Sequence, residues 1–175
     1  MFSDPQKNIE QFNLPAGATV ADIGAGSGFY AFAVAKAVTG SGKVYAIDIQ
    51  NDLLQKLKKE AHLRKITNIE VLRGNAEKVR GTGLKDGAVD AAVVANILFQ
   101  IEDKNSFVAE VSRILKPSGW VLVVEWSDSW KGMGPEVSRI VRKEDAKRLF
   151  LSVGFSFERD IIAGEHHYGI IFKKN

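Results

Sequence analysis

Short apolar stretches alternate with longer amphipathic ones along the chain. The short stretches are rich in β-branched residues and mostly do not alternate with polar ones, which is typical of parallel strands buried on both faces. They lie at 20–23, 43–47, 69–72, 90–95 and 120–125. Between them, 29–38, 51–65 and 104–115 are expected to be helices, the last ended by Lys116-Pro117. This alternation predicts βαβ units in a doubly wound α/β sheet.

The last part of the chain has a different pattern. A helix is expected over 143–155, closed by Gly154, and two strands at 156–163 and 166–174 flank a Gly164-Glu165 turn, which predicts an antiparallel hairpin. If the first of these strands runs parallel to the others, the turn lies at the carboxyl edge of the sheet, where ligands bind. His166 and Tyr168 then share one face of the last strand, and His167 takes the other.

Composition limits the alternatives. A chain of 175 residues with no repeat or linker is expected to form a single domain, 1–175. The net charge of +3 does not demand a nucleic-acid partner, although a pI of about 9.1 leaves one open. The absence of cysteine excludes disulfides, thiolate-liganded metals and thiolate nucleophiles, and no metal ion is expected. With no signal-peptide pattern and no apolar run of about 20 residues, a cytoplasmic location without a membrane partner is expected.

The stretch VADIGAGSGFY, residues 20–30, predicts a strand, a glycine-rich turn and a helix. A dinucleotide fingerprint requires a third glycine where Phe29 stands, so that motif does not fit. Asp22 beside the turn would repel a pyrophosphate and suits a cationic ligand. Asp48, at the end of the next strand, is placed to accept hydrogen bonds from a ribose diol. These features favour a nucleoside that carries a positive charge, and the alternative is a purely structural turn.

At this point the chain resembles a known family. VADIGAGSGFY, VYAIDIQ, GNAEKV, DGAVDAAVVANILFQIEDK and LKPSGWVLVVEW follow one another as in the class I S-adenosylmethionine-dependent methyltransferases, and the resemblance extends over nearly the whole chain. It is strongest to the small-molecule group that includes the ubiquinone/menaquinone-biosynthesis type. It implies a Rossmann-like, doubly wound seven-stranded sheet of order 3-2-1-4-5-7-6, mostly parallel with the last strand antiparallel. It also implies S-adenosyl-L-methionine as the cofactor.

The resemblance assigns the cofactor site residue by residue. The residues expected to bind the cofactor are Asp22, Gly24, Ala25, Gly26, Gly28, Asp48, Ile49, Asn75, Ala76 and Asn96. Asp48 would take the ribose hydroxyls and Ile49 would pack on adenine. Asn75 stands where the family often has an aspartate that contacts the adenine amino group, and its amide oxygen can accept the same hydrogen bond more weakly.

The acceptor is expected to be a small molecule, methylated by in-line displacement with catalysis mainly by positioning. The residues after Asn96 lack the two prolines that amino-directed nucleic-acid methyltransferases carry at this place. The lack of cysteine also disfavours covalent attack on pyrimidines and arsenite methylation. Two alternatives stay open: an RNA methyltransferase of the same fold, and a protein that binds S-adenosylmethionine without transferring its methyl group. A dinucleotide-binding domain is a more distant one.

Two segments are expected to build the acceptor side: an N-terminal cover over 1–16, with Phe2 and Phe12 in a lid or in the core, and a loop over 126–142. The expected substrate contacts are Phe99, Trp126, Trp130 and Tyr168, unless the tryptophans only fill space under the loop. A histidine titrates near neutrality, so His166 or His167 can take a proton from the acceptor. The alternative is that both are ordinary polar residues at a strand end.

Overall fold

The computed structural model describes residues 3–175 and contains one seven-stranded sheet of order β3-β2-β1-β4-β5-β7-β6. The strands are β1 (Thr19–Ile23), β2 (Lys43–Asp48), β3 (Ile69–Arg73), β4 (Val89–Ala95), β5 (Leu115–Trp126), β6 (Phe155–Ile161) and β7 (His167–Lys174). The helices are α1 (Pro5–Phe12), α2 (Phe29–Ala37), α3 (Asn51–Leu63), α4 (Lys104–Ile114), α5 (Lys143–Leu151) and the short 3₁₀ helix η1 (Val137–Arg139). The β5–β7 and β6–β7 pairs are antiparallel and the other pairs are parallel, which confirms the predicted sheet.

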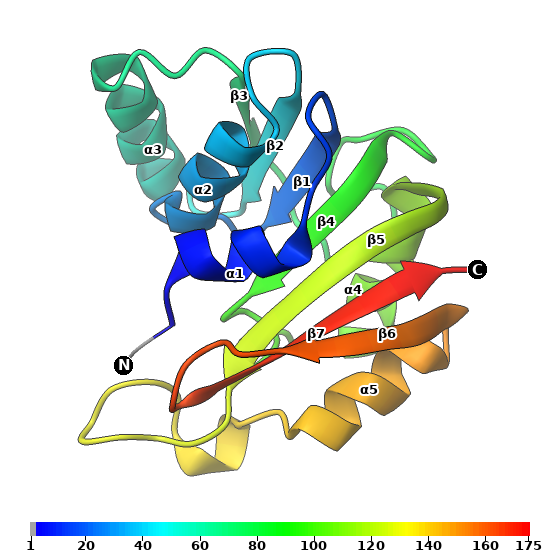
Figure 1. Cartoon of the computed structure of the whole chain (residues 1–175). Helices are drawn as coiled ribbons and strands as arrows, with labels where there is room; N and C mark the ends of the chain where they lie inside the picture. Colours follow the sequence, from blue (N-terminus) through cyan, green and yellow to red (C-terminus); the bar gives the residue numbers. More distant parts are fainter. Residues whose placement is uncertain (1–2) are drawn as a thin grey trace.

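Helices cover both faces of the sheet (Figure 1). Successive side chains of a strand point to opposite faces, and β5 shows the result. Val121 and Val123 pack in the layer of α4 and α5, whereas Leu122 and Val124 pack in the layer of α1 and α2. Apolar side chains on both faces explain why the strands do not alternate in sequence.

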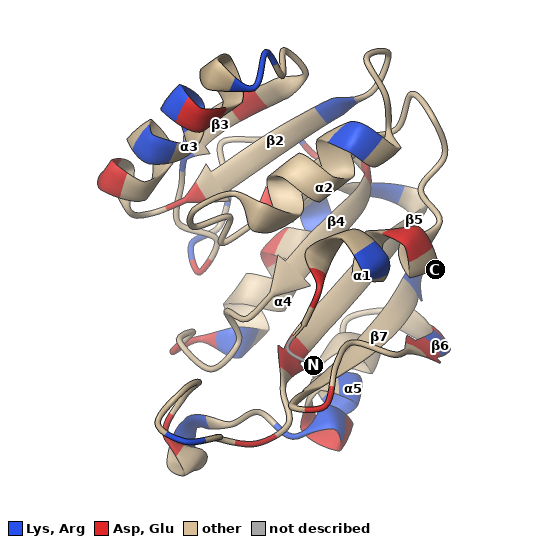
Figure 2. Cartoon of the chain, turned by 60° about the vertical axis from the view of Figure 1, so that its left-hand side comes forward, with Lys and Arg blue, Asp and Glu red and all other residues tan. Residues whose placement is uncertain are grey.

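Helix α3 shows how an amphipathic stretch settles on the sheet. Leu54, Leu57 and Ala61 are buried, and the lysines between them point outward, where they appear as blue segments along the helix (Figure 2). Within residues 3–175, no helix is long and apolar enough to cross a membrane.

The transition from α4 to β5 differs from the sequence prediction. Helix α4 ends at Ile114 and β5 begins at Leu115, ahead of Lys116-Pro117, because Leu115 already pairs with Val89. The register then shifts before Trp120. The backbone of this stretch is irregular: Ser118 has a φ of 60°, and a Cβ on Gly119 would lie 2.9 Å from the Lys116 carbonyl oxygen. The sequence of the stretch therefore did not show the apolar pattern of a strand.

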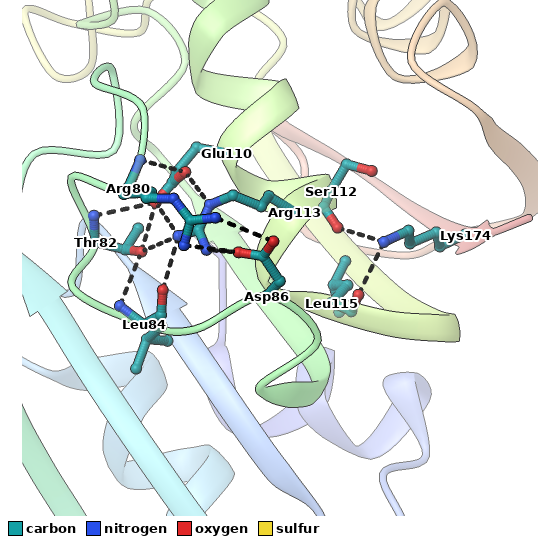
Figure 3. A network of polar contacts seen from close by, with 9 residues as sticks. All are labelled: Arg80, Thr82, Leu84, Asp86, Glu110, Ser112, Arg113, Leu115 and Lys174. Carbon is teal, nitrogen blue, oxygen red and sulfur yellow. Dashed lines mark hydrogen bonds and ion pairs between the residues drawn. The ribbon is translucent and has the colours of Figure 1, made fainter.

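A polar network fastens the segment before β4 to α4 (Figure 3). The buried Glu110 carboxylate accepts hydrogen bonds from the backbone N–H groups of Arg80 and Thr82 and from the Thr82 hydroxyl at 2.6 Å. Arg113 donates to Glu110 at 2.7 Å and also to Asp86 at 2.6 Å. A buried carboxylate is tolerated here because a cation and backbone donors surround it.

Helix α1 is tied to both the α2 side and the far hairpin. Asn8 donates a 2.8 Å hydrogen bond to the Tyr30 hydroxyl, which also contacts the Ser3 hydroxyl at 3.2 Å. The Gln11 amide bonds both the carbonyl oxygen and the N–H of Ile162, at 2.9 and 3.0 Å. Phe12 is buried in the core, which answers the question of lid or core for that residue, whereas Phe2 lies outside the described residues.

Candidate functional site

A cavity of about 660 Å³ opens at the carboxyl ends of β1, β2 and β4. Nine of the ten residues predicted to bind the cofactor line it, namely Asp22, Gly24, Ala25, Gly26, Asp48, Ile49, Asn75, Ala76 and Asn96. Ser3 and Pro5 of the expected N-terminal cover and Gln100 also line it, as do Tyr30, Leu53 and Phe107, which the sequence did not single out as pocket residues. Ser3 and Pro5 bring the start of the described chain to the cavity wall.

Gly28, the tenth residue, does not line the cavity. It caps α2 with a φ of 87°, and a Cβ added there would lie 2.7 Å from Leu57 Cγ of α3 and 3.2 Å from the Phe32 ring. The absence of a side chain at Gly28 therefore allows α2 and α3 to pack closely.

The glycine turn is held by backbone hydrogen bonds to β2. The N–H groups of Gly24 and Ala25 donate to the Ile47 carbonyl oxygen at 2.8 and 3.0 Å, and that of Gly26 donates to Asp48 Oδ2 at 2.8 Å. A Cβ on Gly24, whose φ is 75°, would lie 2.0 Å from Ile97 Cδ1. Position 24 therefore needs glycine for two reasons: the turn has a positive φ there, and any side chain would collide with Ile97.

Two acceptor oxygens beside the turn lack a hydrogen-bond partner among the described residues. One carboxylate oxygen of Asp22 and the amide oxygen of Asn96 are both buried and unpaired. Burial raises the pKa of Asp22 to about 7. Unpaired buried acceptors are costly, so this wall suits a ligand that supplies hydrogen-bond donors and positive charge.

The predicted ribose and adenine contacts have structural roles as well. Asp48 Oδ1 accepts from the Gln50 N–H at 2.8 Å while its other oxygen holds Gly26. Asn75 Oδ1 accepts from the Glu77 N–H at 2.9 Å, which closes the turn after β3. Ile49 is 55% exposed at the cavity, although it is a large apolar side chain.

The predicted acceptor residues lie outside the cavity. None of Phe99, Trp126, Trp130, His166, His167 and Tyr168, all within the described chain, lines it. Strand β7 begins at His167, one residue later than predicted, and lies beside the end of β5 as the resemblance implied, with His167 opposite Trp126 and Tyr168 opposite Glu125. Tyr168 is buried and its hydroxyl donates to the Val141 carbonyl oxygen at 2.8 Å, and burial raises its pKa.

Both histidines contact the loop that follows β5. His166 Nδ1 lies 2.8 Å from Asp128 Oδ1, and its ring stacks on Trp130 with 5.1 Å between centroids. The buried His167 ring lies 4.2 Å from that of Trp126, and burial lowers its pKa. Neither ring nitrogen of His167 has a hydrogen-bond partner among the described residues.

The same loop is more regular than its sequence indicated. Trp130 and Met133 bond each other through their backbones, and Lys131 and Gly132 between them have φ values of 48° and 76°. Two successive positive φ values are typical of a tight hairpin turn. A Cβ on Gly134 would lie 2.8 Å from the Trp126 ring, so the ring packs closely on Gly134 as well as against His167.

Sequence reasoning missed two carboxylates that hold the loop between β4 and α4, residues 96–103. Glu125 Oε1 accepts from the backbone N–H groups of Ile97 and Leu98, both at 2.6 Å. Glu77 Oε2 accepts from those of Glu102 and Asp103, both at 2.9 Å. The available signal for Glu125 was an acidic residue directly after four apolar ones in VLVVEW.

Residues 3–175 contain no group of three or more potential metal ligands.

Comparisons with known proteins show which family the chain belongs to. The model of a methyltransferase domain family matches residues 14–154. A demethylmenaquinone methyltransferase of Geobacillus sp. (strain WCH70) is 26% identical over 70% of this chain and 51% of its own length. A ubiquinone/menaquinone biosynthesis C-methyltransferase of Burkholderia mallei (strain SAVP1) is 35% identical over 70% of this chain and 49% of its own. The chain thus spans about half the length of these curated relatives.

A solved structure is similar over almost the whole chain. It is an S-adenosylmethionine-dependent methyltransferase from Aquifex aeolicus, 26% identical, with a TM-score of 0.90 and coverage of 99% of this chain and 91% of that one. The similarity therefore includes the N-terminal helix and the final hairpin as well as the segment that the family model matches.

Proposed function

The chain belongs to the methyltransferase domain family, and from this premise we propose that it transfers a methyl group from S-adenosyl-L-methionine to a small-molecule acceptor. The observation that carries the proposal is the buried, unpaired carboxylate oxygen of Asp22 in the wall of the cavity. A dinucleotide would bring phosphates to that place, whereas S-adenosylmethionine brings a cationic amino group and a sulfonium. We also propose that the protein is cytoplasmic, as its sequence led us to expect.

Each cofactor residue has a physical reason for its role. Asp22 and Asn96 offer unpaired oxygens to the ammonium group, and the glycine turn lets the backbone approach the methionine part. Asp48 holds the turn and retains lone pairs for the ribose hydroxyls. Ile49 presents an exposed apolar side chain that an adenine ring would cover. The cofactor itself supplies the activated methyl group and the leaving group.

The acceptor is proposed to enter from the β4–β5 side, between the residue 96–103 loop, the 126–142 loop and the final hairpin. The curated relatives act in quinone biosynthesis by their names, which supports a small organic acceptor rather than a nucleic acid. Phe99, Trp126, Trp130 and Tyr168 stay predicted contacts. Trp126 is partly exposed and already contacts Gly134 and His167, so an acceptor would meet the part of its ring that these two residues leave uncovered.

The histidines provide a test of acid–base chemistry. If either takes the acceptor's proton, His166→Ala or His167→Ala will lower kcat about 100-fold, the usual contribution of a general base, while the affinity for S-adenosylhomocysteine stays unchanged. Steady-state kinetics and calorimetric titration separate the two quantities. Unchanged kcat in both variants would leave the histidines as supports of the 126–142 loop.

The cofactor assignment is tested by binding and then by turnover. Thermal shift and calorimetry should show that S-adenosylhomocysteine stabilises the folded chain and that NAD does not. Asp22→Asn should weaken that binding. Formation of S-adenosylhomocysteine from S-adenosylmethionine is then followed over a panel of small molecules and RNA. Turnover on RNA alone would contradict the proposed acceptor class, and NAD binding would contradict the cofactor.

A further inference from the structure

Glu125 occupies an unusual place for a carboxylate. It is 1% exposed and follows four consecutive β5 residues, Val121–Val124, that are apolar and fully buried. Burial raises its pKa to about 7. A buried carboxylate reduces stability unless it makes compensating contacts. One of its oxygens, Oε1, accepts two short hydrogen bonds, from the N–H groups of Ile97 and Leu98, while Oε2 is buried without a hydrogen-bond partner among the described residues.

Those two N–H groups determine the direction of the loop after β4. Asn96, the residue before them, has a φ of 55°, so the chain turns sharply there. The Asn96 N–H is still paired with the Val124 carbonyl oxygen of β5 at 2.8 Å, but the next residues leave the sheet. Glu125 is therefore the group that fixes where Ile97 lies after the turn.

Ile97 in turn lies against the glycine turn. Its Cδ1 fills the space where a Cβ on Gly24 would be, 2.0 Å away, and its side chain lines the cavity. The far end of the loop is held separately, by Glu77 and by Lys104, whose Nζ donates to the Ile101 carbonyl oxygen at 2.7 Å. Removal of Glu125 would thus release the half of the loop that touches Gly24 and leave the other half in place.

We propose that Glu125 is a positioning residue for the cofactor: from the end of β5 it holds the Ile97–Leu98 backbone, and through Ile97 it keeps the wall opposite Gly24 in the binding geometry. This inference rests on the proposed function. It also links the strand on the acceptor side to the cofactor side of the cavity. Glu125 touches neither ligand in this scheme.

The experiment compares Glu125→Ala, Glu125→Asp and Glu125→Gln. Loss of the anchor leaves the competent loop conformation only partly populated, and affinity falls by that fraction. Glu125→Ala should weaken S-adenosylhomocysteine binding about ten-fold or more, and Glu125→Asp, one methylene short of the two N–H groups, several-fold. Glu125→Gln should stay within about three-fold, because its amide oxygen accepts the same two hydrogen bonds. The amide protons of Ile97 and Leu98 should be shifted downfield in the wild type and Glu125→Gln and not in Glu125→Ala.

A matched control removes another carboxylate that holds a backbone N–H. Asp90 accepts from the Thr19 N–H at 2.8 Å near the amino ends of β1 and β4, at the opposite end of these strands from the cavity. Asp90→Ala should lower Tm without changing the affinity. Equal affinity in wild type and Glu125→Ala, or a loss in Asp90→Ala as large as in Glu125→Ala, would overturn the positioning role. If Glu125→Ala does not fold, unchanged affinity in Glu125→Asp overturns it. Failure of the wild type to bind S-adenosylhomocysteine would instead refute the proposed function, and the positioning role with it.

Discussion

Gly24 is the residue at which the shape of the cavity is most sensitive to a single atom. Gly24→Ala places a Cβ 2.0 Å from Ile97 Cδ1 at a φ of 75°, so Ile97 must move within the cavity wall. We expect the affinity for S-adenosylhomocysteine, measured by calorimetry, to fall at least about ten-fold.

The control for this change is Gly83→Ala. Gly83 has nearly the same φ, 76°, but a Cβ there meets nothing within 4 Å. It should cost about 1 kcal/mol of stability from backbone strain alone and leave the affinity unchanged. If Gly24→Ala binds as well as Gly83→Ala, the close contact with Ile97 does not matter for the ligand. Adding Ile97→Ala to Gly24→Ala should restore part of the affinity.

Asp22 is the residue at which ligand charge and protonation are coupled. Its pKa is raised to about 7 in the protein without ligand, and an ammonium group beside it favours the charged carboxylate and lowers that pKa. Binding at pH 6 to 7 should therefore release a fraction of a proton. Calorimetry in buffers of different ionisation enthalpy measures the release, and Asp22→Asn should abolish it. Proton uptake on binding would contradict this placement of the cation.

Among the elements, α1 adds a buried hydrogen bond from Asn8 to the Tyr30 hydroxyl to its apolar packing on α2. Tyr30→Phe removes one of the two acceptors of the buried Asn8 amide and leaves the Ser3 hydroxyl as the other, so the free energy of unfolding should fall by about 1 kcal/mol. Amide exchange in α1 should rise more than in α5. Tyr168→Phe is the matched control, since its hydroxyl bonds Val141 on the other side of the sheet. Equal exchange of α1 in the two variants would show that Tyr30 does not hold the helix.

The elements were also the level at which the sequence was most informative. Apolar runs and caps predicted all seven strands within a few residues, apart from β5, whose start at Leu115 depends on pairing with Val89 across a register shift. The residues that line the cavity could be named in advance because they follow strand ends in an order that resembles the methyltransferase family. The contact of Glu125 with Ile97 was not, because it joins a side chain to backbone 28 residues away and leaves no periodic pattern.

At the scale of the whole molecule, the Glu110–Arg113 network predicts how the fold responds to acid. Burial by itself raises the pKa of Glu110, but hydrogen bonds from Arg113 and Thr82 outweigh it and lower the pKa to about 2. The network therefore stabilises the fold above about pH 4.5, the ordinary value for glutamate, and this stability is lost as the pH falls toward 2.

Glu110→Gln tests this dependence. It should cost about 3 kcal/mol at pH 7, as expected for breaking a buried ion pair, and the difference from wild type should shrink between pH 5 and pH 2 in thermal melts. Glu60→Gln removes an exposed i,i+4 partner of Arg64 and should cost little at any pH. A wild-type advantage over Glu110→Gln that persists undiminished at pH 2 would contradict the lowered pKa.

The hydrogen bonds between Gln11 and Ile162 have a consequence for synthesis of the chain. The two residues are 151 positions apart, so a ribosome adding about 5–20 residues per second makes the second roughly 8–30 s after the first. Throughout that interval the nascent α1 lacks one of its two attachments. Ile9 and Phe12 can already pack on α2, whereas the hydrogen bonds to Ile162 form only after that residue has been made. The attachment of the first helix is thus completed among the last events of folding during translation.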